Sequence, residues 1–329
     1  MSSSEFIKRL LKHRVMLPPL SGYTDYPYRL ILAKFHPPFI MTEMVSAQAV
    51  IRKNPRTMQI LEKVEGKHYN GVQLYGSDPK TMGEAAKLVE SFGFDYIDIN
   101  MGCTIKKVAS RGAGISLMKQ EENASLVTSN VVNSVNIPVT CKLRLGATKQ
   151  DINVVSLSQK LMNAGATAIT IHGRTGEKKF GLPVDFDMMK SVVDNVSIPI
   201  VANGGIYTGK DAQTMIQRTG AAAVMPGRSL IGNPWLVSEI TSVFSDKSFL
   251  RPSLKNKKEV CLEHLQNLCD FYGMGRGVLK MRKILPEYFS NCHNLKNLKL
   301  EVQHASSFSE ILAFMEGIYE ADGNIFYKK

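Results

Sequence analysis

Residues 138–172, PVTCKLRLGATKQDINVVSLSQKLMNAGATAITIH, decide the fold. They predict a strand at 138–144, a helix over 151–164 and a second strand at 168–172. The outer runs are short and contain β-branched residues, whereas the middle segment carries apolar residues at spacings of three and four. This order predicts two parallel strands joined by a helical crossover.

The same unit repeats on both sides of this stretch. Further strands are predicted at 15–20, 39–44, 70–75, 96–101, 198–203 and 222–226, and further helices at 79–92, 121–135 and 208–218. Eight strands that alternate with helices over about 230 residues predict an α/β fold, a (β/α)8 TIM barrel. An open doubly wound sheet is the alternative, but no glycine-rich dinucleotide fingerprint follows the first strand.

The pattern changes towards the C-terminus. Residues 244–258 are polar and contain proline, and 259–272, 277–289 and 307–319 have helical periodicity without a strand run. We therefore expect a catalytic barrel over 1–243, a linker over 244–258 and a small all-helical bundle over 259–329.

Composition limits the class of protein. The chain has 329 residues, of which 44% are hydrophobic, and a formal net charge of +12. This charge favours polyanionic partners, and the alternative is that it serves solubility alone. The five cysteines are odd in number and irregularly spaced, so we expect no disulfide framework and a cytoplasmic location. No apolar run approaches the roughly 20 residues of a membrane helix. No cysteine and histidine spacing fits zinc, so we expect no metal site. We also expect a monomer.

Glycine turns end the last two predicted strands. Asn203-Gly204-Gly205 follows one, and Gly227-Arg228 follows the other just before a predicted helix. Loops at these positions of a barrel commonly hold phosphate, because glycine lets backbone N–H groups approach closely and the N-terminus of a following helix adds a favourable dipole. The alternative is that the glycines only make tight turns.

Three further residues end other strands at the edge where barrels place their active sites. Lys142 lies in an apolar run, where burial is costly unless an anion is near; a salt bridge to a barrel carboxylate is the alternative. His172 fits either a binding role or a buried core position. A lone cysteine is more often an inert buried thiol than a catalytic one, but the position of Cys103 after a strand favours a catalytic role.

The sequence resembles the tRNA-dihydrouridine synthase family, most closely its bacterial branch, from about residue 15 to 319. The resemblance is carried by PPLSGYTDYPYR at 18–29, VQLYGSDP at 72–79, DINMGCTIKKV at 98–108, IHGRT at 171–175, VANGGI at 201–206 and MPGRSLIGNPW at 225–235. HLQNLCDFYG at 264–273 and KMRKILPEYF at 280–289 resemble the helical RNA-binding domain of the family. Two departures are Thr104, where the family usually has proline, and Ser21, where alanine is common.

The resemblance implies an FMN-dependent oxidoreductase that reduces uridine in tRNA to dihydrouridine with NADPH. Cys103 would be the general acid, and Asn100 and Arg174 would contact the substrate. The resemblance also implies FMN contacts from Pro19, Leu20, Ser21, Gln73, Lys142, His172, Asn203, Gly204, Gly205, Gly227 and Arg228.

A uracil stacked in RNA cannot reach a barrel mouth, so we expect the base to be extruded. Lys106 and Lys107 are expected to contact RNA phosphates near Cys103, and Arg282 and Lys283 to contact RNA from the tail. Three alternatives stay open: the same reaction on ribosomal RNA, an FMN barrel oxidoreductase for a small pyrimidine, and an RNA-binding protein that has lost catalysis.

Overall fold

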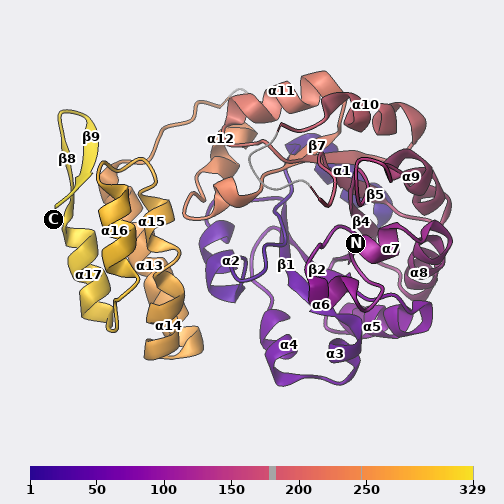
Figure 1. The fold of residues 1–329 in the computed structure, drawn as a ribbon, viewed down its shortest axis with the longest axis horizontal. Coiled ribbons are helices and arrows are strands. Elements are labelled where there is room, and N and C mark those ends of the chain that lie inside the picture. The colour runs from indigo at the N-terminus through magenta and orange to yellow at the C-terminus, as the bar shows by residue number, and fades with distance from the viewer. Residues whose placement is uncertain (178–182, 246, 329) are drawn as a thin grey trace.

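A computed structural model describes residues 1–177, 183–245 and 247–328. Residues 178–182 of the predicted barrel, Asp246 of the predicted linker and Lys329 of the predicted tail domain lie outside the described residues. Seven parallel strands form one sheet in chain order, and the helices between them cover its outer side (Figure 1). The strands are β1 (Phe39–Ser46), β2 (Tyr69–Tyr75), β3 (Tyr96–Asn100), β4 (Val139–Arg144), β5 (Ala168–His172), β6 (Ile200–Asn203) and β7 (Ala223–Met225).

The (β/α)8 barrel prediction is confirmed, but the first predicted strand, 15–20, is wrong in extent. Only Val15 pairs with this sheet, through a parallel bridge to Val224 of β7. The amide of Met16 donates to Val224 O at 3.0 Å. Pro18 and Pro19 follow immediately, and a proline has no N–H with which to continue a ladder. The eighth strand position is therefore a single bridge that brings β7 back beside the start of the chain.

Helices join the strands on the outside of the sheet. The predicted helices 79–92, 121–135, 151–164 and 208–218 are confirmed as α5 (Pro79–Ser91), α8 (Glu121–Ser134), α9 (Val154–Asn163) and α11 (Gly209–Thr219). Capping explains where two of them begin: Asp78 accepts from Thr81 N, and Thr208 forms a capping box with Asp211. The other barrel helices are α1 (Ser3–His13), α2 (Tyr26–Ala33), α3 (Ala47–Ile51), α4 (Pro55–Ile60), α6 (Lys106–Ala109), α7 (Ile115–Met118), α10 (Phe186–Asn195) and α12 (Leu236–Ser242).

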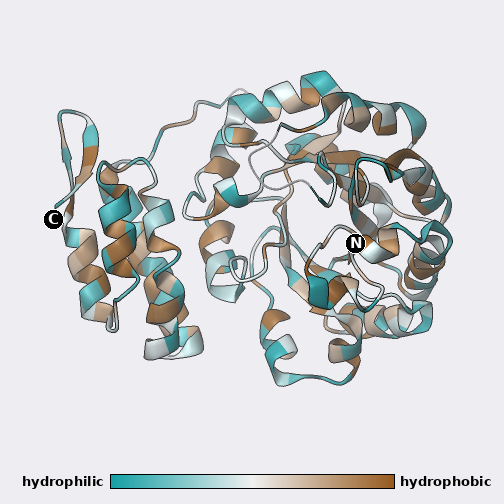
Figure 2. Ribbon diagram, viewed as in Figure 1, coloured by the Kyte–Doolittle hydropathy of each residue, from teal (hydrophilic) through white to brown (hydrophobic). Residues whose placement is uncertain are grey.

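One large core lies between the strands and these helices. Most helices carry both hydrophobic and hydrophilic residues (Figure 2), as expected for segments with one face on a sheet and one in solvent. A smaller cluster closes the amino-terminal end of the barrel, where Phe6 and Leu10 of α1 are fully buried. The ring of Phe6 lies 4.6 Å from that of Phe39 and 5.4 Å from that of Tyr96. Helix α1 therefore plugs one end of the barrel.

The C-terminal part packs as a separate layer beside α2 and α12 (Figure 1). Its helices are α13 (Leu254–Tyr272), α14 (Met274–Met281), α15 (Leu285–Tyr288), α16 (Leu295–Val302) and α17 (Phe308–Glu316). The helix predicted at 277–289 is broken, with Pro286 in the first turn of α15. Helix α13 begins inside the predicted linker, at Leu254.

The tail is mainly helical, as predicted, but it is not all-helical. Strands β8 (Ile318–Ala321) and β9 (Asn324–Tyr327) form an antiparallel hairpin. Asp322 and Gly323 form the turn with φ of 50° and 72°. An Asp-Gly pair with both φ values positive is a favoured two-residue hairpin turn. Within the described residues, no helix has the length and apolar character needed to cross a membrane.

The C-terminal layer is tied to the barrel by ring stacking and charged contacts. His264 of α13 stacks on Tyr28 of α2, with ring centroids 4.8 Å apart. Lys280 forms a salt bridge of 2.9 Å with Asp25. Lys283 donates to Gly22 O at 2.7 Å, in the loop between the first bridge and α2. This loop also carries three of the predicted cofactor contacts, so the helical layer helps to hold one wall of the barrel mouth.

Candidate active site

A cavity of about 680 Å³ opens at the carboxyl ends of the strands. Its size is within the usual range for a cofactor or small-ligand site. Every residue that the sequence predicted for the site lines it: Pro19, Leu20, Ser21, Gln73, Asn100, Cys103, Lys142, His172, Arg174, Asn203, Gly204, Gly205, Gly227 and Arg228. Parallel strands explain this convergence, because all their carboxyl ends meet at the same end of a barrel.

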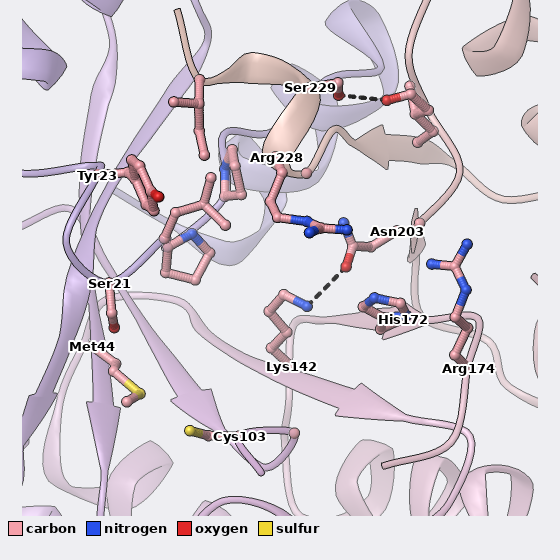
Figure 3. Close-up of a pocket in the computed structure, with 18 of the residues that line it drawn as sticks. Ser21, Tyr23, Met44, Cys103, Lys142, His172, Arg174, Asn203, Arg228 and Ser229 are labelled. Carbon is pink, nitrogen blue, oxygen red and sulfur yellow. Dashed lines mark hydrogen bonds between the residues drawn. The ribbon is translucent and has the colours of Figure 1, made fainter. Parts of the chain in front are cut away.

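Two glycine loops form one wall of the cavity. Gly204 and Gly205 have φ of 112° and 69°, values that residues with a side chain rarely adopt. A Cβ added at Gly227 would meet no atom within 4 Å, so this backbone borders open space. Ser229 Oγ donates to Ile206 O at 2.5 Å and ties the two loops together (Figure 3). Glycine backbone that lines a cavity in this way suits a phosphate group.

The helix predicted after Gly227 is only a three-residue 3₁₀ turn, η1 (Arg228–Leu230). Such a short turn has little dipole, so an anion here would depend on Arg228 and the glycine amides. This corrects the expectation that a helix N-terminus contributes to the site.

Positive charge dominates the cavity walls. Lys142, Arg144, Arg174 and Arg228 all line it, and Figure 3 shows Arg228 and Cys103 on opposite sides with Lys142 between them. Lys142 Nζ donates to Asn203 Oδ1 at 3.1 Å. Burial lowers the pKa of Lys142 and the charge of Arg144 adds to this, whereas the carboxylate of Asp98 raises it. The arrangement favours an anionic ligand.

His172 lies on the same wall as a neutral imidazole. Burial, followed by the charges of Lys142, Arg144 and Arg174, lowers its pKa to about 2. Its Nδ1 is buried and makes no hydrogen bond to any described residue. A buried polar atom without a partner costs stability unless a ligand satisfies it. This atom, the glycine wall and the cationic lining together fit a phosphate-bearing, polar cofactor such as FMN.

Cys103 is the accessible thiol of the protein. It is half-buried at the cavity, whereas Cys141, Cys261, Cys269 and Cys292 are buried elsewhere. Burial raises the pKa of the Cys103 thiol above its ordinary value of 9.0, and a hydrogen bond from Ile105 N and the charge of Arg144 oppose this. The thiol therefore stays protonated at neutral pH and can act as an acid.

Several residues of the cavity had no role predicted from the sequence. Arg144 donates from Nε to Gly102 O at 2.8 Å and from Nη1 to Thr175 O at 3.1 Å, which holds the Cys103 loop against β4. Its place two residues after Lys142, on the same face of a strand, was a usable signal. Tyr207 and Glu287 had no such signal, because the first lies in a loop and the second comes from the helical layer. Within the described residues, no group of three or more potential ligand side chains could hold a metal ion.

Comparison with known proteins agrees with this geometry. The family model described as dihydrouridine synthase matches residues 16–321. The chain belongs to the dihydrouridine synthase family. It is 34% identical to "tRNA-dihydrouridine synthase B" of Pasteurella multocida over 310 residues, which is 94% of this chain and 93% of the relative. It is 32% identical to the protein of the same name from Proteus vulgaris, over 94% of this chain and 96% of the relative. The chain is therefore an enzyme of this family along nearly its whole length.

A solved structure supports the fold alone. The chain is similar to histamine dehydrogenase from Rhizobium sp. 4-9, with a TM-score of 0.54 and 15% sequence identity. The match covers 77% of this chain and 49% of that one.

Proposed function

We propose that this enzyme reduces the C5=C6 bond of uridine in tRNA to dihydrouridine, with FMN held in the barrel mouth, NADPH as the reductant and Cys103 as the general acid. The observation that carries the proposal is a half-buried thiol and a cluster of cations on one cavity, with a glycine wall beside them. Two relatives of nearly the same length carry tRNA-dihydrouridine synthase names.

Residues at the carboxyl ends of β4 to β7 would bind the cofactor. The amides of Gly204, Gly205 and Gly227, with Arg228, suit the phosphate, and His172 Nδ1 offers a hydrogen-bonding site to the ring system. Lys142 would favour negative charge on the bound ring. When bound, FMN supplies the hydride that the uracil accepts at C6.

Cys103 would complete the reduction from the other face of the base. Addition of a hydride at C6 leaves negative charge at C5, where a proton must follow. The Cys103 thiol carries that proton at neutral pH because burial raises its pKa. Asn100 and Arg174 would orient the base on the same cavity. Thr104, in place of the usual proline, is exposed and leaves the adjacent backbone less restricted than proline would.

RNA would reach the cavity across an exposed basic rim. Lys106 and Lys107 of α6 are exposed directly after the Cys103 loop and suit phosphate contacts. Arg282 and Lys283 are less suited than the sequence suggested, since both make intramolecular contacts. Arg282 Nε donates to Ala305 O at 2.6 Å, and Lys283 Nζ donates to Gly22 O. Their replacement would disturb the fold and the Ser21 loop as well as RNA binding.

The test is reduction of unmodified tRNA by the purified full-length protein with NADPH. We expect a yellow protein that adds two hydrogens to uridine, measured by mass spectrometry of nucleosides from the treated tRNA. Parallel reactions with ribosomal RNA and with free uracil distinguish the alternatives. Absence of bound flavin, or turnover of free uracil as fast as tRNA, would contradict the proposal.

A further inference from the structure

Beneath the floor of the cavity, a fully buried carboxylate begins a chain of hydrogen bonds. Asp98 of β3 is 0% exposed and lies inside the barrel. Its Oδ1 accepts from Thr140 Oγ1 at 2.6 Å, and its Oδ2 accepts from Gln73 Nε2 at 2.7 Å. Burying an ionisable group is costly, and the charge of Lys142 offsets part of that cost for Asp98.

The chain of bonds continues to the surface of the cavity. Gln73 Oε1 accepts from Asn100 Nδ2 at 2.8 Å. Asn100 Oδ1 then accepts from the backbone amides of Gly102 at 3.2 Å and Cys103 at 3.0 Å. Asp98 is thus connected through two amide side chains to the loop that carries the Cys103 thiol.

The carboxylate at one end and the backbone amides at the other fix which group donates in each of these hydrogen bonds. Burial raises the pKa of Asp98 to about 6, and hydrogen bonds from Thr140 and Gln73 and the charge of Lys142 oppose this, so the carboxylate is ionised at neutral pH. An ionised carboxylate only accepts hydrogen bonds, so Gln73 turns its NH₂ group to Asp98 and its oxygen to Asn100. Asn100 must then turn its NH₂ group to Gln73 and its oxygen to the backbone amides, which only donate. Each amide therefore has one orientation that satisfies both neighbours. The other N–H of Asn100 faces only Met44 Sδ at 3.8 Å, a weak acceptor.

We propose that Asp98 is a positioning residue, which through Gln73 sets the orientation of Asn100 and holds the Cys103 loop in place for proton transfer. The proposal rests on the proposed function for its catalytic consequence, but its structural claim does not. Asn100 can then offer a substrate only an N–H donor, which suits a carbonyl oxygen of the base. The substitution Asp98→Asn would remove this control, because a neutral amide can either donate to Gln73 or accept from it.

The test compares Asp98→Asn with Asp95→Asn in the full-length protein. Asp95 lies just before the other end of β3, and its Oδ2 accepts from Asn70 N at 2.8 Å, so the control makes the same chemical change away from the cavity. The first measurement is the rate of Cys103 alkylation by iodoacetamide, without tRNA, since the other four cysteines are buried. The second is kcat and KM on unmodified tRNA, together with the melting temperature.

For Asp98→Asn we expect the alkylation rate to change about fivefold or more. We expect kcat to fall on the order of 10-fold, because a misplaced acid slows chemistry. KM for tRNA should stay near the wild-type value, because phosphate contacts outside the cavity dominate RNA affinity. A purely structural role would lower the melting temperature and leave the alkylation rate of the folded protein unchanged. Asp95→Asn should leave alkylation and kcat as they are.

If Asp98→Asn does not fold, Thr140→Val becomes the deciding variant, because it removes the hydroxyl that donates to the same carboxylate. We expect it to change the alkylation rate in the same direction by a smaller factor. Wild-type rates in whichever variant folds, or an equal change in Asp95→Asn, would overturn the proposal. A wild-type protein that fails to reduce tRNA would refute the proposed function instead, and the alkylation rates would still decide the role of Asp98.

Discussion

The two ends of the barrel are built from the same strands but serve different purposes. At the amino-terminal end, Phe6 of α1 packs against Phe39 and Tyr96, and all three rings are buried. At the carboxyl end, the same strands finish in polar residues around a cavity of about 680 Å³. Stability and chemistry can therefore be changed separately in this protein, as barrel architecture allows.

The largest expected effect is at the carboxyl end, from Cys103→Ala. Loss of a general acid should reduce turnover on tRNA by about 10²–10⁴-fold, with bound flavin and melting temperature nearly unchanged. Cys292→Ala, which changes a buried cysteine of the helical layer, should retain turnover. Single-turnover reduction of tRNA measures both. Retention of turnover in Cys103→Ala would remove the thiol from the mechanism.

At the closed end, Phe6→Ala should reduce stability and leave turnover unchanged. Truncation of this fully buried ring should lower the free energy of unfolding by about 3–5 kcal/mol. Turnover per folded molecule should stay the same, because the ring lies at the far end of the strands from the cavity. Urea denaturation measures the loss, and Leu11→Ala, at an exposed position on the same helix, is the control. An equal loss in both variants would mean that α1 does not plug the barrel.

Lys142→Met tests the charge of the cavity. The substitution keeps most of the side-chain volume but removes the amine that donates to Asn203. We expect FMN affinity to fall by about 1.5–3 kcal/mol, the usual value of a hydrogen bond to a charged group, and the reduction potential of the bound flavin to fall as well. Fluorescence titration measures the affinity. Lys190→Met, on the exposed face of α10, should change neither quantity.

Two pairs of exposed lysines, one at each end of the barrel, extend the comparison to RNA binding. Lys106 and Lys107 lie beside the cavity, whereas Lys8 and Lys12 lie on α1 at the closed end, and all four are exposed. Replacing the first pair with alanine should weaken tRNA binding and reduce the slope of affinity against salt by about two. Replacing the second pair removes the same charge and should leave that slope unchanged. Similar losses in both double variants would indicate that net charge alone attracts the RNA.

The smallest expected effect is that of pH on the rate of tRNA reduction. A general acid works only while protonated, and burial raises the pKa of the Cys103 thiol above 9.0. Proton donation should therefore be constant through neutral pH and be lost only as pH rises through that higher value. Stopped-flow reduction of tRNA by the pre-reduced enzyme measures this profile. A decline that begins near neutral pH would show that the thiol ionises too early to be the acid.

Local sequence predicted much of the fold because strands and helices alternate with clear periodicity. The helix over 151–164 appears as Val154–Asn163, and the run at 168–172 appears as Ala168–His172. The strand at 15–20 was overpredicted because apolar composition was weighed above the missing N–H groups of Pro18 and Pro19. The C-terminal hairpin was missed although Asp322-Gly323 is a turn signal, because the helix predicted over 307–319 included the first residues of β8.

The sequence predicted which strand-end residues gather at the cavity, because the carboxyl ends of parallel strands must meet at one end of a barrel. Cys103, Lys142 and the two glycine loops followed from that rule alone. Only the tertiary structure decided how these groups act. The protonated thiol depends on burial, and the neutral His172 depends on burial and then on three neighbouring cations. The link from Asp98 to Asn100 depends on contacts across β2 and β3. Burial, charge and hydrogen bonding are set by neighbours far apart in the chain, which a local sequence pattern does not record.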